Sequence, residues 1–185
     1  MIYLNDDIAQ IDLDAAISQL SAQRREQALR FSHELGRRQC IAAYLLLREA
    51  LRSEYGIEEP PTFEYGIHGK PSLTGRSDIH FNLSHCRAGV ICAVDRRPIG
   101  IDMETIRPYK EALARHTMND DELRQIAAAA RPEVEFIRLW TMKEALLKCT
   151  GEGITRDLKT VLTGRERIET TVNEEKGYVY SVCFS

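Results

Sequence analysis

Apolar residues recur at helical spacing through the first third of the chain. Residues 8–20 have apolar residues at a spacing that predicts a helix, namely Ile8, Ile11, Leu13, Ile17 and Leu20. Ser21 is suited to cap a second helix, because its hydroxyl can accept bonds from the free amides of a first turn. The strongest helical pattern covers residues 34–55, which are rich in alanine and leucine and stop at Gly56.

Helical patterns return after residue 119. Asn119 or Asp120 is suited to cap a helix over 120–130. Pro132 then opens a helix whose many apolar positions predict extensive burial, and glycines from residue 151 onward end it.

Between and after these helices the chain has the composition of strands. Residues 62–94 contain short runs of Ile, Val and Phe separated by Gly/Pro turns, and 98–103 forms another such run. Residues 158–163 and 167–184 are also predicted to be strands. The order is helix and sheet, twice, about a boundary near residue 97. Such segregated elements predict an α+β fold rather than a wound α/β fold.

Composition narrows the class of protein. The chain has 185 residues, 43% of them hydrophobic, and a net charge of −3, which disfavours a nucleic-acid binder. We expect no signal peptide and no membrane span, because no apolar run is long enough. Five cysteines without a C-x-x-C suggest buried thiols in a reduced, cytoplasmic protein. His80, His85 and Cys86 match no standard zinc spacing.

The segment around Asp102 carries the first chemical signal. Strand side chains alternate between faces, so Asp102 and Glu104 project to one side, ~7 Å apart at their Cα atoms, and Ile101 and Met103 to the other. Two carboxylates on one face can share a hard cation such as Mg²⁺. Gly100 lacks a side chain, so we expect that a ligand could approach the backbone there. The alternative is a solvated face whose acids meet only water or basic partners.

A helical segment carries the second signal. Glu144 and Lys148 lie four residues apart, on one face of the helix that covers residues 140–148. They could be an ordinary surface ion pair. They could also be a third metal carboxylate, able to accept a proton from a serine hydroxyl, beside a lysine that steadies a phosphate.

Two further segments carry groups that suit a phosphate. Lys70 lies in a tight Gly-Lys-Pro turn, and Ser84 and His85 follow a short strand. A cation, a hydroxyl and an imidazole together could cradle a phosphate. Each segment could equally be a surface turn or a local cap.

Taken together and in order, these four segments resemble the 4′-phosphopantetheinyl transferase superfamily in its longer, single-chain, surfactin-synthetase-activating form. The resemblance spans roughly residues 24–154. Its motifs are GKPSL at 69–73, FNLSH at 81–85, IGIDMET at 99–105 and WTMKEALLKCTGEGI at 140–154.

The resemblance implies two pseudo-symmetric α+β halves in one chain, each a small antiparallel sheet packed with helices. They would cover residues 1–97 and 98–185, with the active site in the cleft between them and the protein acting as a monomer.

The resemblance also implies a reaction, in which a serine of an apo acyl or peptidyl carrier protein attacks the β-phosphate of coenzyme A. Asp102, Glu104 and Glu144 would hold Mg²⁺, or Mn²⁺, on the pyrophosphate. Glu144, or a water on the metal, would take the serine proton. Lys148 would favour departure of 3′,5′-ADP.

Several more residues would surround coenzyme A in this resemblance. They are Lys70 and Pro71 at the adenine and 3′-phosphate, Ser84 and His85 at phosphate oxygens, Lys143 and Lys148 beside the site, and Arg24 as one of several arginines available to the 3′-phosphate. The chain departs from the family at Gln27, where a basic residue is expected, and it is short after residue 154.

Two other functions stay open at this point. A catalytically silent relative would bind coenzyme A or a carrier protein without transfer, and the intact carboxylates and lysines disfavour it. A two-metal phosphodiesterase would need further His and Asp ligands, which the sequence does not offer.

Overall fold

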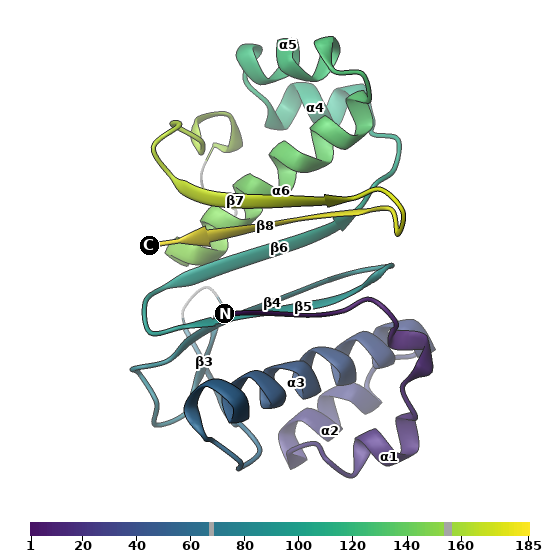
Figure 1. Ribbon diagram of the computed structural model, residues 1–185, viewed down its shortest axis with the longest axis vertical. Coiled ribbons are helices and arrows are strands. Elements are labelled where there is room, and N and C mark those ends of the chain that lie inside the picture. The colour runs from purple at the N-terminus through teal and green to yellow at the C-terminus, as the bar shows by residue number, and fades with distance from the viewer. Residues whose placement is uncertain (67–68, 154–156) are drawn as a thin grey trace.

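Two long helices, each packed against a small sheet, organise the molecule (Figure 1). The computed structural model describes residues 1–66, 69–153 and 157–185. Helix α3 (Glu34–Tyr55) ends at Gly56 and helix α6 (Pro132–Thr150) ends at Gly151, both glycines having the left-handed conformation of a helix C-cap. Proline at the first turn of α6 and glycine after its end agree with the predicted helix.

The first half of the chain contains strand β1, a 3₁₀ turn, three helices and four further strands. These elements are β1 (Ile2–Asn5), η1 (Ile8–Gln10), α1 (Leu13–Ile17), α2 (Ala22–Leu29), α3, β2 (Phe63–Tyr65), β3 (Pro71–Leu73), β4 (His80–Cys86) and β5 (Gly89–Asp95). Ser21 caps α2 by accepting a bond from the Arg24 amide, as predicted.

The second half repeats the plan with one strand, three helices, a 3₁₀ turn and a hairpin. These elements are β6 (Ile99–Thr105), α4 (Glu111–Thr117), α5 (Asp120–Ala128), α6, η2 (Leu158–Thr160), β7 (Arg167–Asn173) and β8 (Tyr178–Phe184). Asn119 caps α5 in a reciprocal capping box with Glu122.

The two three-stranded sheets have the same topology. Their strand orders are β1-β5-β4 and β6-β8-β7, all antiparallel. In each half the first strand pairs with the last, and a long helix stands between them in the chain. The β2–β3 hairpin is a separate two-stranded sheet. The α+β fold class is confirmed.

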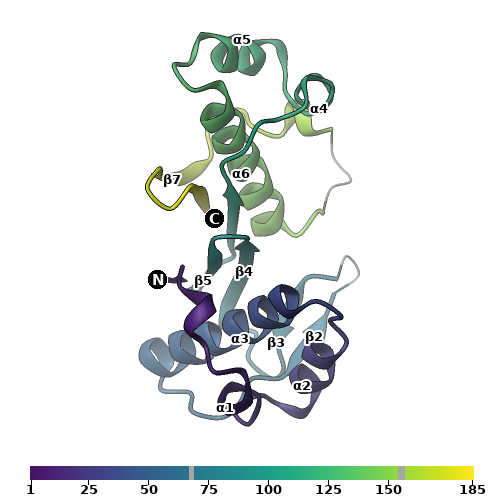
Figure 2. The same cartoon turned by 90° about the vertical axis from the view of Figure 1, so that its right-hand side faces the viewer.

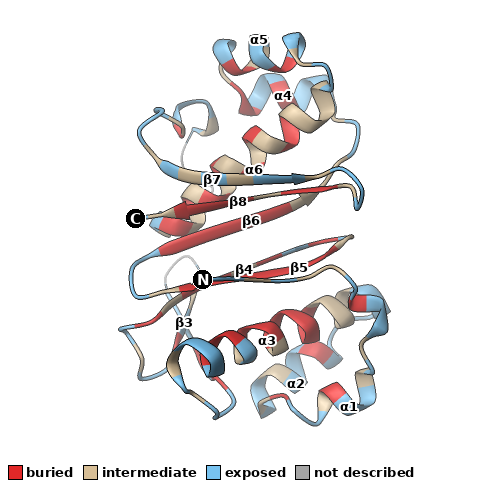
Figure 3. Ribbon diagram, viewed as in Figure 1, coloured by how far each residue is buried: buried red, intermediate tan, exposed pale blue. Residues whose placement is uncertain are grey.

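The two sheets meet in the middle of the molecule, with helices towards both ends of its long axis (Figures 1 and 2). Ile101 and Met103 are fully buried among residues of both sheets, including Ile91 and Ala93. Figure 3 shows β6 coloured as buried along most of its length. The predicted direction of Ile101 and Met103 is therefore confirmed.

The prediction that a ligand approaches the backbone at Gly100 is wrong. A Cβ added there would lie 2.0 Å from the Ala145 carbonyl oxygen and 2.4 Å from the Cys149 nitrogen. Helix α6 thus crosses β6 in direct contact with its backbone, and glycine is needed for packing.

Two other expectations about elements also fail, and two further elements were not expected. Strand β1 and helix α4 were not predicted, because both are short. The expected strand over 158–163 begins instead with the 3₁₀ turn η2, whose N-cap Asp157 accepts a bond from the Lys159 amide. The expected helix over 8–20 is divided into η1 and α1. Ile154, the last residue of the motif at 140–154, lies outside the described residues.

All five cysteines are buried and none forms a disulfide. None of the helices in the described chain combines the length and the apolar character needed to cross a membrane.

Candidate active site

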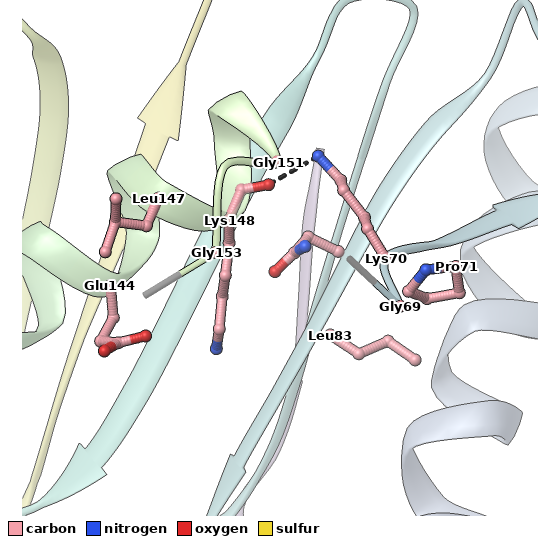
Figure 4. Close-up of a pocket in the computed structure, with 10 residues that line it drawn as sticks. Gly69, Lys70, Pro71, Leu83, Glu144, Leu147, Lys148, Gly151 and Gly153 are labelled. Carbon is pink, nitrogen blue, oxygen red and sulfur yellow. Dashed lines mark hydrogen bonds between the residues drawn. The ribbon is translucent and has the colours of Figure 1, made fainter. Parts of the chain in front are cut away.

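A pocket of about 240 Å³ lies where the two halves meet (Figure 4). The Gly-Lys-Pro turn and strand β4 form its wall from the first half, and α6 with the residues after it forms the wall from the second half. Its lining residues are Gly69, Lys70, Pro71, Asn82, Leu83, Glu144, Leu147, Lys148, Gly151 and Gly153. The volume is below the ~300–1,000 Å³ of pockets that enclose a whole drug-sized ligand, so it suits part of a larger molecule.

Lys148 joins the pocket to the carboxylate strand. Its Nζ donates to Asp102 Oδ1 at 2.6 Å, to the Ile101 carbonyl oxygen at 3.2 Å and to Ser84 Oγ at 3.3 Å. An ammonium has three donor hydrogens, so these contacts engage all of them. Residues from β4, β6 and α6, which are far apart in sequence, therefore meet at one ammonium group.

The Ser84 hydroxyl is shared between β4 and β6. It donates to Asp102 Oδ1 at 3.0 Å and accepts from the Met103 amide at 3.1 Å. Two residues earlier, Asn82 Oδ1 accepts from the Ile101 amide at 3.2 Å. These bonds attach the free edge of β6 to side chains of β4. Because Ser84 is buried and its one hydrogen already faces Asp102, its first evident role is to hold the carboxylate strand.

Glu144 and Glu104 lie close enough to Asp102 for its negative charge to change their pKa values. Burial raises the pKa of Glu144, the negative charge of Asp102 raises it further, and Lys148 partly offsets both effects. The pKa of Glu104 is raised by burial and then by Asp102, and lowered by Arg107 and Lys148. Three carboxylates thus repel one another in a partly dry site, which favours a shared cation.

Two carboxylate oxygens that lack a hydrogen-bond partner indicate whether a cation fits this site. In the described part of the chain, Asp102 Oδ2 and Glu144 Oε1 are buried and have no hydrogen-bond partner. Buried carboxylate oxygens without a partner are costly, and a hard cation such as Mg²⁺ would satisfy them. The donor set therefore fits the ion.

The carboxylates do not form a finished metal site, however. Within residues 1–66, 69–153 and 157–185, no three Asp, Glu, His or Cys side chains are close enough together to hold a metal ion. Lys148 provides the positive charge beside Asp102 in this arrangement.

Lys70 connects the first half to the end of α6. Its Nζ donates to the carbonyl oxygens of Lys148 at 2.6 Å and Cys149 at 3.1 Å, and Figure 4 shows the side chain reaching across the pocket. The end of a helix carries partial negative charge, so a cation is favoured there. Burial lowers the pKa of Lys70. Among the described residues, these two carbonyls leave one of its three donor hydrogens for a ligand.

His85 follows Ser84 on β4 and reaches the surface. Protein atoms around the ring lower its pKa, and the charge of Lys148 lowers it further against an opposing effect of Asp102. The lowered pKa favours the neutral ring, which carries one donor N–H.

Two predicted residues lie away from this pocket. Lys143 is buried, and its Nζ donates to Glu122 and to two backbone carbonyl oxygens on the far side of α6. The Arg24 guanidinium stacks over the rings of Tyr44 and Phe63 and donates to Cys40 Sγ. The geometry gives no support to the expectation that Lys143 contacts coenzyme A, because its three donor hydrogens are engaged.

Asn82 and Leu83 line the pocket but were not singled out from the sequence. A signal for Asn82 was present, because Asn82 and Ser84 are alternate polar residues of one strand, separated by the apolar Leu83. No such signal marked Leu83 as a pocket residue, since a leucine in a strand is usually a core residue.

Comparisons with known proteins identify the family of this chain. A family model described as "4'-phosphopantetheinyl transferase superfamily" matches residues 98–183. A solved structure, the holo-[acyl-carrier-protein] synthase of Thermotoga maritima, is similar over 46% of this chain and 61% of its own, with 13% identity and a TM-score of 0.40. That likeness is too distant to bear on the site.

Relatives in sequence are much closer. The 4′-phosphopantetheinyl transferase Sfp of Bacillus subtilis is 31% identical over 160 residues, which cover 85% of this chain and 71% of the relative. The transferase psf-1 of Bacillus pumilus is 34% identical, with 85% and 69% covered. HetI of a Nostoc strain is 37% identical, with 80% and 67% covered. With this identity over most of both sequences, the chain belongs to the 4′-phosphopantetheinyl transferase superfamily.

Proposed function

We propose that this protein transfers the 4′-phosphopantetheine group of coenzyme A to a serine of an apo carrier protein, releasing 3′,5′-ADP. One observation carries the proposal: polar side-chain atoms of Asp102, Ser84 and Lys148 lie 2.6–3.3 Å from one another. The pocket beside them is lined by Lys148, Glu144 and Lys70, among others. Chemistry-bearing residues from both halves converge there, in a chain of this family. We propose the same cleft as the active site and a single copy of the chain as the active unit.

Asp102, Glu104 and Glu144 would hold Mg²⁺, with Mn²⁺ as an alternative because both prefer carboxylate oxygen. When bound, the ion offsets the negative charge of the coenzyme A pyrophosphate, so that an oxygen nucleophile can approach. The orphaned oxygens of Asp102 and Glu144 support this assignment.

Glu144 and Lys148 act in the two remaining parts of the reaction, which are the removal of the serine proton and the departure of 3′,5′-ADP. Glu144 accepts the proton of the carrier serine, and its raised pKa makes it a better base than an ordinary carboxylate. The serine oxygen forms a bond to the β-phosphorus while the bond from that phosphorus to the bridging oxygen breaks. The bridging oxygen leaves with 3′,5′-ADP. Lys148 lines the pocket, and its positive charge offsets the negative charge that develops on that oxygen, without a hydrogen bond beyond those it already makes.

The pocket would take only the phosphate region of coenzyme A, in agreement with its volume. Lys70 and Pro71 border it on the side of the first half, and Lys70 has one donor that no described residue engages, for a phosphate oxygen. His85 adds a neutral N–H donor near Lys148. Ser84 acts chiefly by holding Asp102 and Lys148 in place.

The proposal is tested by incubating the protein with coenzyme A, Mg²⁺ and apo carriers from fatty-acid, polyketide and peptide synthesis. The mass of each carrier is then measured. The expected result is a gain of one phosphopantetheine group on at least one carrier, lost in Asp102→Ala and nearly lost in Glu144→Gln. Binding of coenzyme A without a mass gain on any carrier would instead indicate a catalytically silent relative.

A further inference from the structure

Asn82 is a polar residue of strand β4 that lines the pocket and takes no part in the proposed reaction. It is 6% exposed, so its carboxamide is almost enclosed by the protein. Its Oδ1 accepts from the Ile101 amide at 3.2 Å. Enclosed polar atoms in proteins are normally paired, so the donor end of the same carboxamide, Nδ2, also needs a partner.

The bond to Ile101 fixes which end of the carboxamide faces the pocket. A backbone N–H can only donate, so the atom that meets the Ile101 amide must be the oxygen. Within residues 1–66, 69–153 and 157–185, Nδ2 donates to no protein atom, and it is not among the fully buried atoms that lack a partner. Nδ2 is therefore accessible, and the pocket that Asn82 lines is the space it reaches.

The donor hydrogens of the pocket are unequally available. Three of its lining side chains carry nitrogen donors, namely Lys70, Asn82 and Lys148. Lys148 has all three of its hydrogens engaged by protein oxygens, and Lys70 has one that no described residue engages. Asn82 Nδ2 has two. Among the described residues, a neutral side chain thus offers more free donor hydrogens to the pocket than either lysine.

These two hydrogens suit an anionic oxygen of a ligand. Asn82 and Glu144 line the same pocket, yet neither Nδ2 nor Glu144 Oε1 has a partner among the described residues, so they do not satisfy each other. A phosphate oxygen accepts strongly, because hydrogen bonds to a charged group are about twice as strong as neutral ones. An amide also donates without adding positive charge, so it does not compete with a cation for the carboxylates.

We infer that Asn82 is a further coenzyme A-binding residue, whose Nδ2 donates to a non-bridging oxygen of the pyrophosphate. The inference rests on the proposed function only in naming coenzyme A as the ligand of this pocket. Oδ1 meanwhile holds the Ile101 peptide, whose carbonyl accepts from Lys148. The two ends of one carboxamide therefore serve the ligand and the strand that carries Asp102.

The first test is Asn82→Asp, which keeps an acceptor for the Ile101 amide and replaces the donor nitrogen with an anionic oxygen. Calorimetry with coenzyme A and Mg²⁺ should show the Kd raised at least about tenfold, as expected for the loss of a hydrogen bond to a charged group. The thermal unfolding midpoint without ligand should stay close to the wild-type value, because the bond to β6 is retained.

The matched control is Asn119→Asp. Asn119 lies outside the pocket lining, and its Oδ1 likewise accepts from a backbone amide, that of Glu122. Aspartate caps a helix as well as asparagine does, so this variant adds the same charge without removing the cap. It should bind coenzyme A with the wild-type Kd.

A second readout uses the wild-type protein and needs no variant to fold. Asparagine occurs at positions 5, 82, 119 and 173, so labelling asparagine with ¹⁵N gives four side-chain amide signals. Coenzyme A with Mg²⁺, in the absence of a carrier, should move the Asn82 signal downfield as its hydrogens bond to phosphate. The other three signals should keep their positions.

An unchanged Kd in Asn82→Asp would overturn the inference, as would an Asn82 signal that saturating coenzyme A leaves in place. An equal rise of the Kd in Asn119→Asp would also overturn it, because added charge at any position would then be the cause. If wild type binds coenzyme A but modifies no carrier, the proposed function fails and the two binding readouts still decide the role of Asn82. Absence of coenzyme A binding by wild type would overturn both.

Discussion

Lys148 Nζ lies 2.6 Å from Asp102 Oδ1, so the lysine of the long helix and the first carboxylate of the strand form one ion pair across the proposed active site. Asp102 is almost fully buried, whereas Lys148 is partly open to the pocket. This pair joins α6 to β6 at the point where the two halves meet.

Replacing Lys148 with methionine should reduce both activity and stability. The leaving group loses its charge stabilisation, so we expect kcat to fall at least ~100-fold. Asp102 loses its ion-pair partner, which should lower the free energy of unfolding by ~1–3 kcal/mol. Carrier mass measurements and urea denaturation check the two effects. Lys176→Met, which removes a surface lysine paired with Asp6, is the control and should transfer at the wild-type rate.

Removal of divalent metal should abolish transfer. A chelator is expected to stop the reaction and added Mg²⁺ or Mn²⁺ to restore it, because the carboxylates otherwise repel one another and the pyrophosphate. Calorimetry in the presence of coenzyme A should show Mg²⁺ binding to wild type and greatly weakened binding to Asp102→Asn and Glu144→Gln.

Glu169→Gln, an exposed change on β7, is the matched control for metal binding. It should bind Mg²⁺ as wild type does. Undiminished binding in both Asp102→Asn and Glu144→Gln would remove these residues from the proposed metal site.

Gly100→Ala should be strongly destabilising. The added methyl group would overlap the backbone of α6, 2.0 Å from one carbonyl oxygen, so either the helix or the strand must move. We expect a loss of ~1–3 kcal/mol or more in urea denaturation. Gly66→Ala is the comparison, because its nearest contact would be 3.8 Å away. A loss no larger than that of Gly66→Ala would mean that α6 yields easily.

Asp6 should give a pH-dependent contribution to stability. It accepts bonds from Lys176 at 2.7 Å and from the Tyr178 hydroxyl at 3.0 Å, joining the two halves. The bond from Lys176 is the main effect that lowers the pKa of Asp6 below its usual value of 3.8. A lowered pKa stabilises the fold above the unfolded-state value, and this stabilisation disappears as the pH falls through the folded-state value.

The comparison for Asp6 is Asp6→Asn, which keeps an acceptor but removes the charge. At pH 6 it should be less stable than wild type by at most ~1 kcal/mol, since the partner lysine is half exposed. The two proteins should converge near pH 2. A difference that stays constant down to that pH would show that charge is not the cause.

Much of the secondary structure follows directly from the sequence. Helices α3 and α6 are long and rich in helix-forming residues, and glycines end both, so local preference and tertiary packing agree. The prediction of a strand at 158–163 was wrong; it was made because Leu158 and Val161 are apolar residues suited to a strand. Its structure is decided by the Asp157 cap and the bond to Lys143.

The site was predictable only in part. Strand alternation places Asp102 and Glu104 on one face, but the ion pair with Lys148 joins residues 46 positions apart, which no local pattern reveals. The direction of Lys143 depends on where α4, α5 and η2 pack, so its burial is a tertiary result. The need for Gly100 is also visible only once α6 lies across β6.

The strand order shared by the two sheets has a consequence for folding kinetics. In each sheet the central strand, β5 or β8, is the last of its half to occur along the chain. The first strand, β1 or β6, pairs with that central strand, so it cannot pair until the central strand is present. Neither sheet can close through neighbouring residues alone, and such non-local pairing slows folding. During synthesis β1 and β6 each stay unpaired until the whole of their half has emerged, so each half should appear as a late, cooperative unit.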